Sequence, residues 1–178
     1  MEDKLEIRRE VRRRIKGLTD TEKLSAADKI FSHIEQTEIY AQAHCIALYA
    51  AMADEVPTAK TLDRWSTRGK RVVVPRVEGD VMRFYDYSPL QMQSGAYGIY
   101  EPTGDVECPP SEIDLIIVPA RAFTPSGARL GRGGGFYDKY MSLRGFKAHK
   151  TGVAFACQIF DNLPTSPHDI FVDEVVAY

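Results

Sequence analysis

Two stretches at the start of the chain carry apolar residues at the spacing of an amphipathic helix. In the first stretch, apolar residues spaced four or three positions apart share one helical face: Ile7, Val11, Ile15 and Leu18. A second helix is predicted to begin after Thr19, because Thr19 and Glu22 have the spacing of a capping box. Its predicted buried face consists of Leu24, Ala27, Phe31 and Ile34. The chain is therefore expected to open with two helices.

Beyond the second helix the apolar residues form short runs of strand length, most of them nearly unbroken and the one at 82–87 more alternating. These runs occupy residues 45–49, 71–77, 82–87, 114–119, 151–155 and 172–178. Two more helices are expected between them, from Pro57 through Trp65 with a stop at Gly69, and from Phe136 to Leu143 with a stop at Gly145. Apolar strands that alternate with helices are typical of a parallel sheet covered on both faces. We predict an α/β fold, a three-layer α/β/α sandwich around a mostly parallel sheet, with residues 1–178 as a single domain.

Length and charge narrow the classes of function. A chain of 178 residues is long enough for one domain whose core needs no disulfide or metal. The 23 Lys and Arg residues against 25 Asp and Glu residues give a net charge of −2, which disfavours nucleic acid as a partner. No apolar run approaches the roughly 18 residues of a membrane-spanning helix, and the charged start does not resemble a secretory signal. We expect a cytoplasmic protein, a monomer or weak homodimer, that binds a small molecule and neither nucleic acid nor a membrane.

Thiols and imidazoles form no local motif. Cys45, Cys108 and Cys157 lie far apart, and no CxxC or Cys/His cluster with metal-ligand spacing is present. We expect these cysteines, like Trp65, to be packing residues.

The segment 129–138, with the sequence RLGRGGGFYD, is the most informative part of the chain. It follows a strongly apolar strand and opens a predicted helix, and four of the five residues 131–135 are glycines. Glycines let backbone N–H groups turn toward a ligand, a helix N-terminus adds partial positive charge, and Arg129 and Arg132 add full charges. The segment is therefore predicted to bind phosphate, and Asp138 is a candidate ligand for a metal on that phosphate.

Two familiar phosphate-binding motifs do not match this segment. A dinucleotide-binding fingerprint needs glycine where Phe136 stands, and a Walker loop needs Gly-Lys-Ser/Thr. The alternative is a flexible surface turn with a helix cap at Asp138, since glycine clusters are common in loops. Two arginines, two aromatic residues and an acid in one short segment favour a binding site.

Basic residues recur every four positions on the first helix, at Lys4, Arg8, Arg12 and Lys16. Helical geometry puts Lys4 within the apolar arc and Arg8 at its margin. Two interpretations stay open. In the first, which is the commoner arrangement, both side chains extend past the apolar face into solvent. In the second, they reach into a phosphate site.

Acidic residues follow one predicted strand and recur near the end of the chain. Asp54 and Glu55 come just after the run at 45–49, where α/β proteins place ligands. Glu55 is suited to accept hydrogen bonds from a polar heterocycle, but a first-turn helix acid fits equally well. His168 and Asp169 fit a general base or a metal carboxylate, and they also fit a solvated loop.

Taken in order along the chain, these segments resemble the 5-formyltetrahydrofolate cyclo-ligase family, also called 5,10-methenyltetrahydrofolate synthetases. The blocks that carry the resemblance are Lys4 with Arg8, DEVPT at 54–58, VPR at 74–76, GIYEP at 98–102, DLIIVP at 114–119, GARLGRGGGFYD at 127–138, AF-x2-Q at 154–158 and HD-x2-VDEVV at 168–176. The glycine-rich block is the most specific of them.

The resemblance implies an enzyme that uses ATP and Mg²⁺ to cyclise 5-formyltetrahydrofolate to 5,10-methenyltetrahydrofolate, with release of ADP and phosphate. In the family's chemistry ATP phosphorylates the N5-formyl oxygen, N10 attacks the resulting iminium phosphate, and phosphate leaves. Positioning and charge stabilisation suffice for such a transfer, which agrees with the lack of a recognisable Ser/His or Cys/His pair.

The resemblance also implies roles for individual residues. It matches the triphosphate ligands to Lys4 and Arg8, and the nucleotide loop to Arg129, Leu130, Gly131, Arg132, Gly133, Gly134, Gly135, Phe136 and Tyr137. Arg132 is placed to touch both ATP and the formyl group, and Arg132 and Lys4 are the expected catalytic residues. Asp138 and Asp169 match the magnesium positions. Glu55 matches the acid that recognises the pterin, and the expected folate walls include Phe136, Met82 and Tyr97.

Four positions depart from the common family pattern. Gly134 stands where a Lys is common, Phe136 replaces a Tyr, Thr124 lacks a frequent acid, and Val77 replaces a frequent aromatic residue. We expect these departures to affect affinity and leave the reaction class intact.

Two other functions compete with this hypothesis. A nucleotide- or phosphosugar-sensing α/β module without enzymatic activity needs the glycine-rich loop but has no use for Glu55 or Lys4. An RNA-binding protein that acts through its basic first helix would bind with a steep dependence on salt, and the mild net charge disfavours it.

Overall fold

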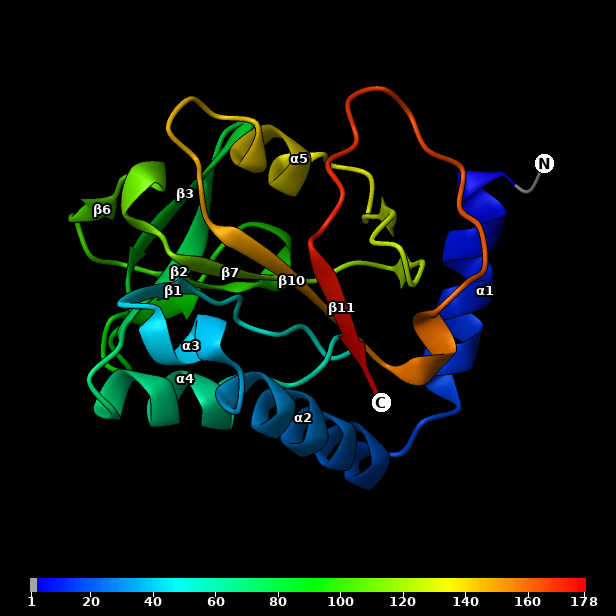
Figure 1. Ribbon diagram of the computed structural model, residues 1–178, viewed down its shortest axis with the longest axis horizontal. Coiled ribbons are helices and arrows are strands. Elements are labelled where there is room, and N and C mark those ends of the chain that lie inside the picture. Colours follow the sequence, from blue (N-terminus) through cyan, green and yellow to red (C-terminus); the bar gives the residue numbers. More distant parts are fainter. Residues whose placement is uncertain (1–2) are drawn as a thin grey trace.

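The computed structural model of the protein describes residues 3–178, and its centre is a seven-stranded sheet (Figure 1). The strand order is β11-β10-β7-β1-β2-β3-β6. The strands span Cys45–Ala47 (β1), Arg71–Glu78 (β2), Val81–Asp86 (β3), Glu107–Cys108 (β6), Leu115–Val118 (β7), His149–Ala154 (β10) and Glu174–Ala177 (β11). The strands from β11 to β2 run parallel, while β3 and β6 pair antiparallel at one edge. The predicted mostly parallel sheet is confirmed.

Helices cover both faces of the sheet, as predicted for a three-layer sandwich. They span Lys4–Lys16 (α1), Asp20–Glu35 (α2), Glu38–Gln42 (α3), Ala59–Thr67 (α4) and Phe136–Met141 (α5). In Figure 1, α2, α3 and α4 lie below the sheet and α5 lies above it, while α1 stands upright at one end. None of the helices within residues 3–178 combines the length and the apolar character needed to cross a bilayer.

The first two helices form where the hydrophobic pattern predicts them. The buried stripe of α1 consists of Ile7, Val11 and Ile15. The Thr19 side chain caps α2 and forms the predicted capping box with Glu22. One residue of the predicted buried face is wrong, because Leu24 is 42% exposed. The buried arc of α2 extends instead to Ala26 and Ile30 on the other flank, so Leu24 at the opposite margin stays in solvent.

The helix α4 begins later than predicted. Thr58 is its N-cap residue, so Pro57 precedes the helix and does not lie in its first turn. The Thr58 hydroxyl donates to the Tyr49 carbonyl at 2.8 Å and accepts from the Ala51 N–H at 3.0 Å. These bonds hold the loop between β1 and α4 against the end of β1, and this loop carries acidic residues of the site described below.

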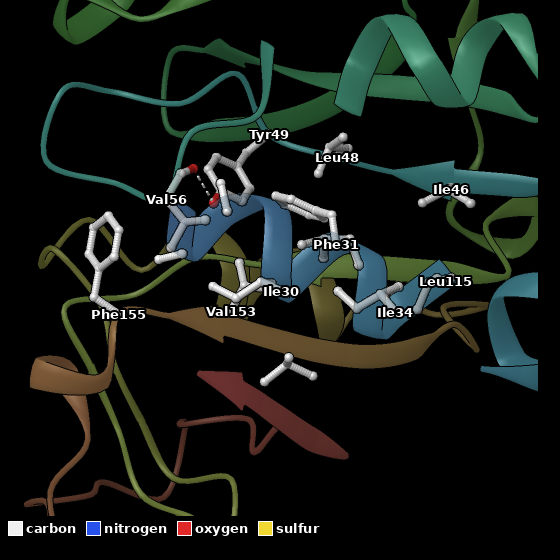
Figure 2. Close-up of a cluster of buried hydrophobic side chains, with 14 of the residues drawn as sticks. Ile30, Phe31, Ile34, Ile46, Leu48, Tyr49, Val56, Leu115, Val153 and Phe155 are labelled. Carbon is white, nitrogen blue, oxygen red and sulfur yellow. Dashed lines mark hydrogen bonds between the residues drawn. The ribbon is translucent and has the colours of Figure 1, made fainter. Parts of the chain in front are cut away.

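The larger apolar cluster lies between the sheet and the helices below it, and Figure 2 shows part of it. Side chains that meet α2 there include Ile46, Leu115 and Val153 from the strands and Leu48 just after β1. The Phe31 ring contacts the fully buried Trp65 ring edge-on, with ring centroids 5.6 Å apart. Trp65 is therefore a core residue, as predicted. Cys45 and Cys108 lie buried in a second cluster, the one that includes residues of α5.

The hydrophobic pattern of the sequence does not predict several short elements of the structure. They are the ribbon of β4 (Met92–Ser94) and β5 (Tyr100–Pro102), the ribbon of β8 (Ala122–Phe123) and β9 (Arg129–Leu130), and the 3-10 turns η1 (Ala96–Gly98), η2 (Pro110–Glu112) and η3 (Ala156–Gln158). Strands of two or three residues are too short to show a hydrophobic period. Both ribbons contribute walls to the site.

Candidate active site

A pocket of about 560 Å³ opens where the parallel strands end at their carboxyl termini. In Figure 1, α1 stands to the right of β10 and β11, and the loop that leads into α5 (yellow) lies between α5 and α1. Ligands of α/β proteins commonly bind at this edge of the sheet. His168, the candidate general base, does not line this pocket. Every residue to which the family resemblance assigns a role does line it: Lys4, Arg8, Glu55, Met82, Tyr97, Arg129, Leu130, Gly131, Arg132, Gly133, Gly134, Gly135, Phe136, Tyr137, Asp138 and Asp169.

The glycine-rich loop between β9 and α5 depends on glycine for its conformation. Gly133 and Gly135 have φ angles of 119° and 70°, which residues with a side chain adopt rarely. Asp138 does not cap α5, because its Oδ1 accepts a hydrogen bond from the Ile170 N–H at 2.9 Å. The helix cap at Asp138, which was part of the alternative interpretation, is therefore wrong. Since α5 has only six residues, side chains and not a helix dipole supply most of the positive charge here.

Arg129 is the buried cation of the loop, with 7% of its surface exposed. Its Nε donates to the Pro119 carbonyl at 3.2 Å, and its Nη1 lies 3.5 Å from Asp138 Oδ1. Burial lowers the pKa of Arg129, and the charge on Asp138 opposes that effect. These contacts fix the guanidinium against the inner wall of the pocket.

The helix α1 contacts the loop directly. Arg8 Nε donates to the Gly131 carbonyl at 2.9 Å. Lys4 Nζ lies 3.8 Å from Asp169 Oδ2, which belongs to the segment before β11. Of the two interpretations of this basic row, the structure agrees with side chains that reach into a site.

Arg132 forms a charged cluster with the loop that follows β1. Its Nη2 lies 2.5 Å from Asp54 Oδ1 and 3.6 Å from Glu55 Oε2. Asp54 Oδ2 also accepts from Nη1 of the buried Arg121 at 2.5 Å. Glu55 Oε1 accepts from the Met52 N–H at 2.8 Å. Glu55 precedes α4 altogether, so it is not the first-turn helix acid that the sequence also allowed.

The environment of this cluster moves the pKa values of the two acids apart. Burial raises the pKa of Glu55, and the Met52 N–H and the charge on Arg132 only partly oppose it. Burial acts in the same direction on Asp54, but hydrogen bonds from Arg132 and Arg121 outweigh it and lower the Asp54 pKa. Burial also opposes the charged form of Arg132, yet its two acidic partners raise its pKa. Neighbouring groups with pKa values shifted in opposite directions are typical of functional sites.

Two more carboxylates, Asp138 and Asp169, lie near Lys4 and Arg129. Asp169 accepts from the Ser166 N–H at 2.8 Å and from the Ser166 hydroxyl at 3.0 Å. Burial alone would raise the pKa of Asp169, but these bonds and the charge on Lys4 outweigh it, so the pKa is lowered. Within residues 3–178, no three or more Asp, Glu, His or Cys side chains gather as a metal centre. Two carboxylates fit a cation such as Mg²⁺, which takes its other ligands from water and phosphate.

Another part of the pocket is apolar and aromatic. It includes the buried Met82 and the rings of Tyr97 and Phe136, whose centroids lie 6.3 Å apart. Gly134 lies against the Phe136 ring, because a Cβ at Gly134 would come within 2.7 Å of Phe136 Cε2. Aromatic faces and a thioether suit contact with a planar heterocycle.

The sequence analysis gave no role to three residues of this region: Asp54, which it noted only as following a strand, Arg121 and Glu101. Arg121 comes shortly after β7 just as Glu55 comes after β1, so the rule that ligands bind at the ends of strands would have pointed to it. Glu101 lines the pocket, is 6% exposed, and accepts from the Val77 N–H at 2.7 Å. It lies in a three-residue strand, which carries no sequence signal of which side chain turns inward.

Three of the four departures from the family pattern, Val77, Gly134 and Phe136, line the pocket. Thr124 does not. Its buried hydroxyl accepts from the Ala128 N–H at 3.0 Å and bonds the Ser126 hydroxyl. Thr124 therefore stabilises the turn between β8 and β9, and its effect on a ligand is indirect.

Known proteins resemble this chain over its whole length. The sequence profile of the 5-formyltetrahydrofolate cyclo-ligase family matches residues 1–178. The 5-formyltetrahydrofolate cyclo-ligase of Haemophilus influenzae is 31% identical over 179 residues, which cover 97% of this chain and 96% of that protein. The enzyme of the same name from Escherichia coli K12 is 29% identical over 175 residues, which cover 94% and 96%.

Solved structures agree with the sequence comparison. The NMR structure of Aquifex aeolicus 5,10-methenyltetrahydrofolate synthetase matches with a TM-score of 0.87 and 32% identity, covering 98% of this chain and 89% of that chain. The 5,10-methenyltetrahydrofolate synthetase from Mycoplasma pneumoniae matches with a TM-score of 0.77 and 26% identity, covering 98% of both chains.

Proposed function

Because this chain belongs to the 5-formyltetrahydrofolate cyclo-ligase family, we propose that it converts 5-formyltetrahydrofolate to 5,10-methenyltetrahydrofolate with ATP and Mg²⁺, releasing ADP and phosphate. The observation that carries the proposal is the pocket of about 560 Å³, in which a cationic glycine-rich loop adjoins an aromatic wall. A triphosphate suits the loop, and a planar pterin suits the wall. The pocket thus has one part suited to each reactant of the cyclisation.

The proposed chemistry turns a poor leaving group into a good one. A formamide oxygen does not leave readily when N10 attacks the N5-formyl carbon. Transfer of the γ-phosphoryl group of ATP to that oxygen breaks the phosphoanhydride bond, releases ADP and forms an iminium phosphate. N10 then attacks the formyl carbon, the C–O bond breaks, and phosphate leaves with the former formyl oxygen and the N10 proton. No enzyme nucleophile is required, so the protein acts by positioning and charge stabilisation.

We assign the triphosphate to the cations of the pocket. Lys4 and Arg8 lie where α1 meets the loop, and Arg129 lies on the inner wall. Arg132 lies 3.6 Å from Glu55, where the cationic part of the pocket meets the part assigned to the pterin. Arg132 is therefore the residue that contacts the transferred phosphoryl group and the formyl oxygen, with Lys4 adding charge stabilisation.

We assign Mg²⁺ to Asp138 and Asp169. When bound, Mg²⁺ neutralises negative charge on the β- and γ-phosphates. Ser166 and Lys4 lower the pKa of Asp169 against the effect of burial, so this side chain offers an anionic oxygen at neutral pH.

We assign the pterin to the part of the pocket that holds Glu55. Its carboxylate accepts hydrogen bonds from ring N–H groups, while Met82, Tyr97 and Phe136 contact the ring faces. Burial raises the pKa of Glu55 in the free protein, and hydrogen bonds from a bound heterocycle favour its ionised form.

The direct test follows the absorbance of the conjugated methenyl product. Purified protein is mixed with 5-formyltetrahydrofolate, Mg²⁺ and ATP, and matched mixtures lack ATP or Mg²⁺. A rise that needs both ATP and Mg²⁺ supports the proposal. No rise from folded protein that binds nucleotide contradicts it and favours the nucleotide- or phosphosugar-sensing module.

The role of Arg132 is tested with Arg132→Ala. We expect kcat/KM to fall at least tenfold, about 1.4 kcal/mol of transition-state stabilisation, with an unchanged melting temperature. Arg144→Ala is the control, since Arg144 is exposed just beyond α5 and does not line the pocket. A smaller loss for Arg132→Ala counts against contact with the transferred group.

A further inference from the structure

We infer that Asp54, held in place by the buried Arg121, is the positioning residue of Arg132. The inference rests on the proposed function in one respect, since that function makes Arg132 the contact of the transferred phosphoryl group. Neither Asp54 nor Arg121 touches the reacting atoms in this arrangement, and both act through Arg132.

Arg132 receives little support from its own loop. It lies between Gly131 and Gly133, and its side chain is 35% exposed. Glycines on both sides leave the backbone unusually free, and a long arginine side chain loses rotamer entropy whenever it binds an anion. A loop that presents this guanidinium at one place therefore needs a contact from another element.

Asp54 provides that contact through both of its oxygens. Oδ1 lies 2.5 Å from Arg132 Nη2, and Oδ2 lies 3.4 Å from Arg132 Nη1. Two parallel contacts between a carboxylate and a guanidinium define the plane of the guanidinium as well as its position. Glu55 lies farther away, at 3.6 Å, and makes a single contact with Arg132.

Arg121 in turn anchors Asp54 to the frame of the glycine-rich loop. Its Nη1 lies 2.5 Å from Asp54 Oδ2. Its backbone N–H donates to the Leu130 carbonyl at 2.8 Å, and its carbonyl accepts from Gln158 Nε2 at 3.1 Å. Leu130 is the last residue of β9, directly before the glycine-rich loop begins. A continuous set of bonds thus runs from β9 through Arg121 and Asp54 to Arg132.

Arg121 has no other evident task. It is 6% exposed, does not line the pocket, and among the ion pairs of residues 3–178 contacts only Asp54. Burial of a charged guanidinium destabilises the fold unless the group is paired, so the presence of Arg121 at this buried position calls for an explanation. As the inner partner of Asp54, it keeps that carboxylate charged and oriented while anionic substrates approach Arg132.

The kinetic test is a double-mutant cycle. Asp54→Asn is expected to lower kcat at least tenfold in the wild-type background and less than twofold in the Arg132→Ala background. The control is Asp86→Asn, which removes another Asp–Arg pair (Arg71 Nε to Asp86 Oδ1, 2.7 Å) away from the pocket. We expect Asp86→Asn to leave kcat unchanged.

Two kinetic outcomes would overturn the inference. An equal loss in both backgrounds means that Asp54 acts independently of Arg132. An unchanged kcat with a lower KM for ATP means that Asp54 competes with phosphate for Arg132 and does not position it.

A second readout needs no turnover. The Arg132 Nε–H resonance, assigned by its absence in Arg132→Ala, reports the order of the guanidinium through ¹⁵N relaxation. We expect its order parameter to fall below about 0.6 in Asp54→Asn and to stay unchanged in Asp86→Asn. An undiminished order parameter in Asp54→Asn overturns the inference. If the wild type shows no cyclisation, the proposed function fails while this measurement still decides the positioning role.

Asp54→Asn leaves Arg121 buried without an anionic partner, and this variant can lose its fold. Asp54→Asn/Arg121→Met removes both charges and keeps an apolar side chain of similar length at position 121. The same cycle and the same relaxation measurement are then carried out on the double variant. The expected loss is again at least tenfold, and wild-type kcat together with an ordered Arg132 overturns the inference.

Discussion

At the scale of single residues, Gly134 and Phe136 form a pair. A Cβ at Gly134 would lie 2.7 Å from Phe136 Cε2 and 2.9 Å from Phe136 Cδ2. The ring therefore occupies the space that a side chain at 134 would need. Two of the departures from the family pattern are thus linked, because the aromatic ring can take this position only beside glycine.

We predict that Gly134→Ala displaces the Phe136 ring and weakens folate binding. Overpacking costs about 1 kcal/mol or more, so the KM for 5-formyltetrahydrofolate should rise roughly fivefold. In the Phe136→Ala background the same substitution should change KM much less. Steady-state kinetics of the four proteins checks this, and additive effects would show that the two positions are independent.

Burial of the Glu55 side chain disfavours its ionised form in the folded protein. Its folded-state pKa is raised, so its stabilising contribution is complete below the unfolded value and is lost as pH rises through the folded pKa. We predict that Glu55→Gln, which does not titrate, gains melting temperature relative to wild type as pH rises from about 4 to about 7. Thermal unfolding across this range measures the difference. A difference that stays constant or shrinks with rising pH would contradict the pKa shift.

At the scale of elements, the β4–β5 ribbon is held to the sheet by two side chains. Glu101 Oε2 accepts from the Val77 N–H at 2.7 Å, while Arg76 Nη1 donates to the Pro102 carbonyl at 3.0 Å and to the Gly104 carbonyl at 2.9 Å. The ribbon carries Tyr97 at its tip, so these bonds set where that ring lies.

We predict that Glu101→Ala loosens the ribbon without unfolding the sheet. A hydrogen bond to a charged group contributes about 1.5–3 kcal/mol, so amides of residues 92–101 should exchange roughly tenfold to a hundredfold faster. Hydrogen exchange by mass spectrometry measures this, with β7 and β10 as internal controls. Equal acceleration in those strands would mean global destabilisation.

At the scale of the whole molecule, the core below the sheet supports the site from a distance. Phe31 is 1% exposed and packs edge-on against Trp65, and neither residue lines the pocket. Figure 2 shows Phe31 among the side chains that join α2 to the strands. The packing of α2 holds the sheet whose strand ends carry the functional loops.

We predict that Phe31→Ala lowers the free energy of unfolding by about 3–5 kcal/mol, through lost burial and a cavity. This is a large fraction of the roughly 5–15 kcal/mol typical of a domain. Urea unfolding should show a lower midpoint with the same m-value. Below the melting temperature, KM should remain within about twofold of wild type, and a loss of stability under about 1 kcal/mol would mean that the core closes around the missing ring.

Features that depend on neighbours along the chain can be read from the amino-acid sequence alone. The stripe of α1, the capping box of α2 and the apolar runs of the parallel strands follow from local periodicity and local hydrogen bonding. The glycine-rich loop was also recognisable, because consecutive glycines beside arginines suit phosphate whatever the surrounding fold. The resemblance to a family supplied the remaining site residues, and all of them line one pocket.

Features that depend on groups far apart in sequence arise only when the chain is folded. The strand order, the exposed position of Leu24 and the β4–β5 ribbon depend on what packs against each element. The link from Arg121 to Asp54 to Arg132 joins three separate segments. No periodicity or spacing encodes such a link, because the energy of a buried ion pair depends on distance and desolvation in the folded state.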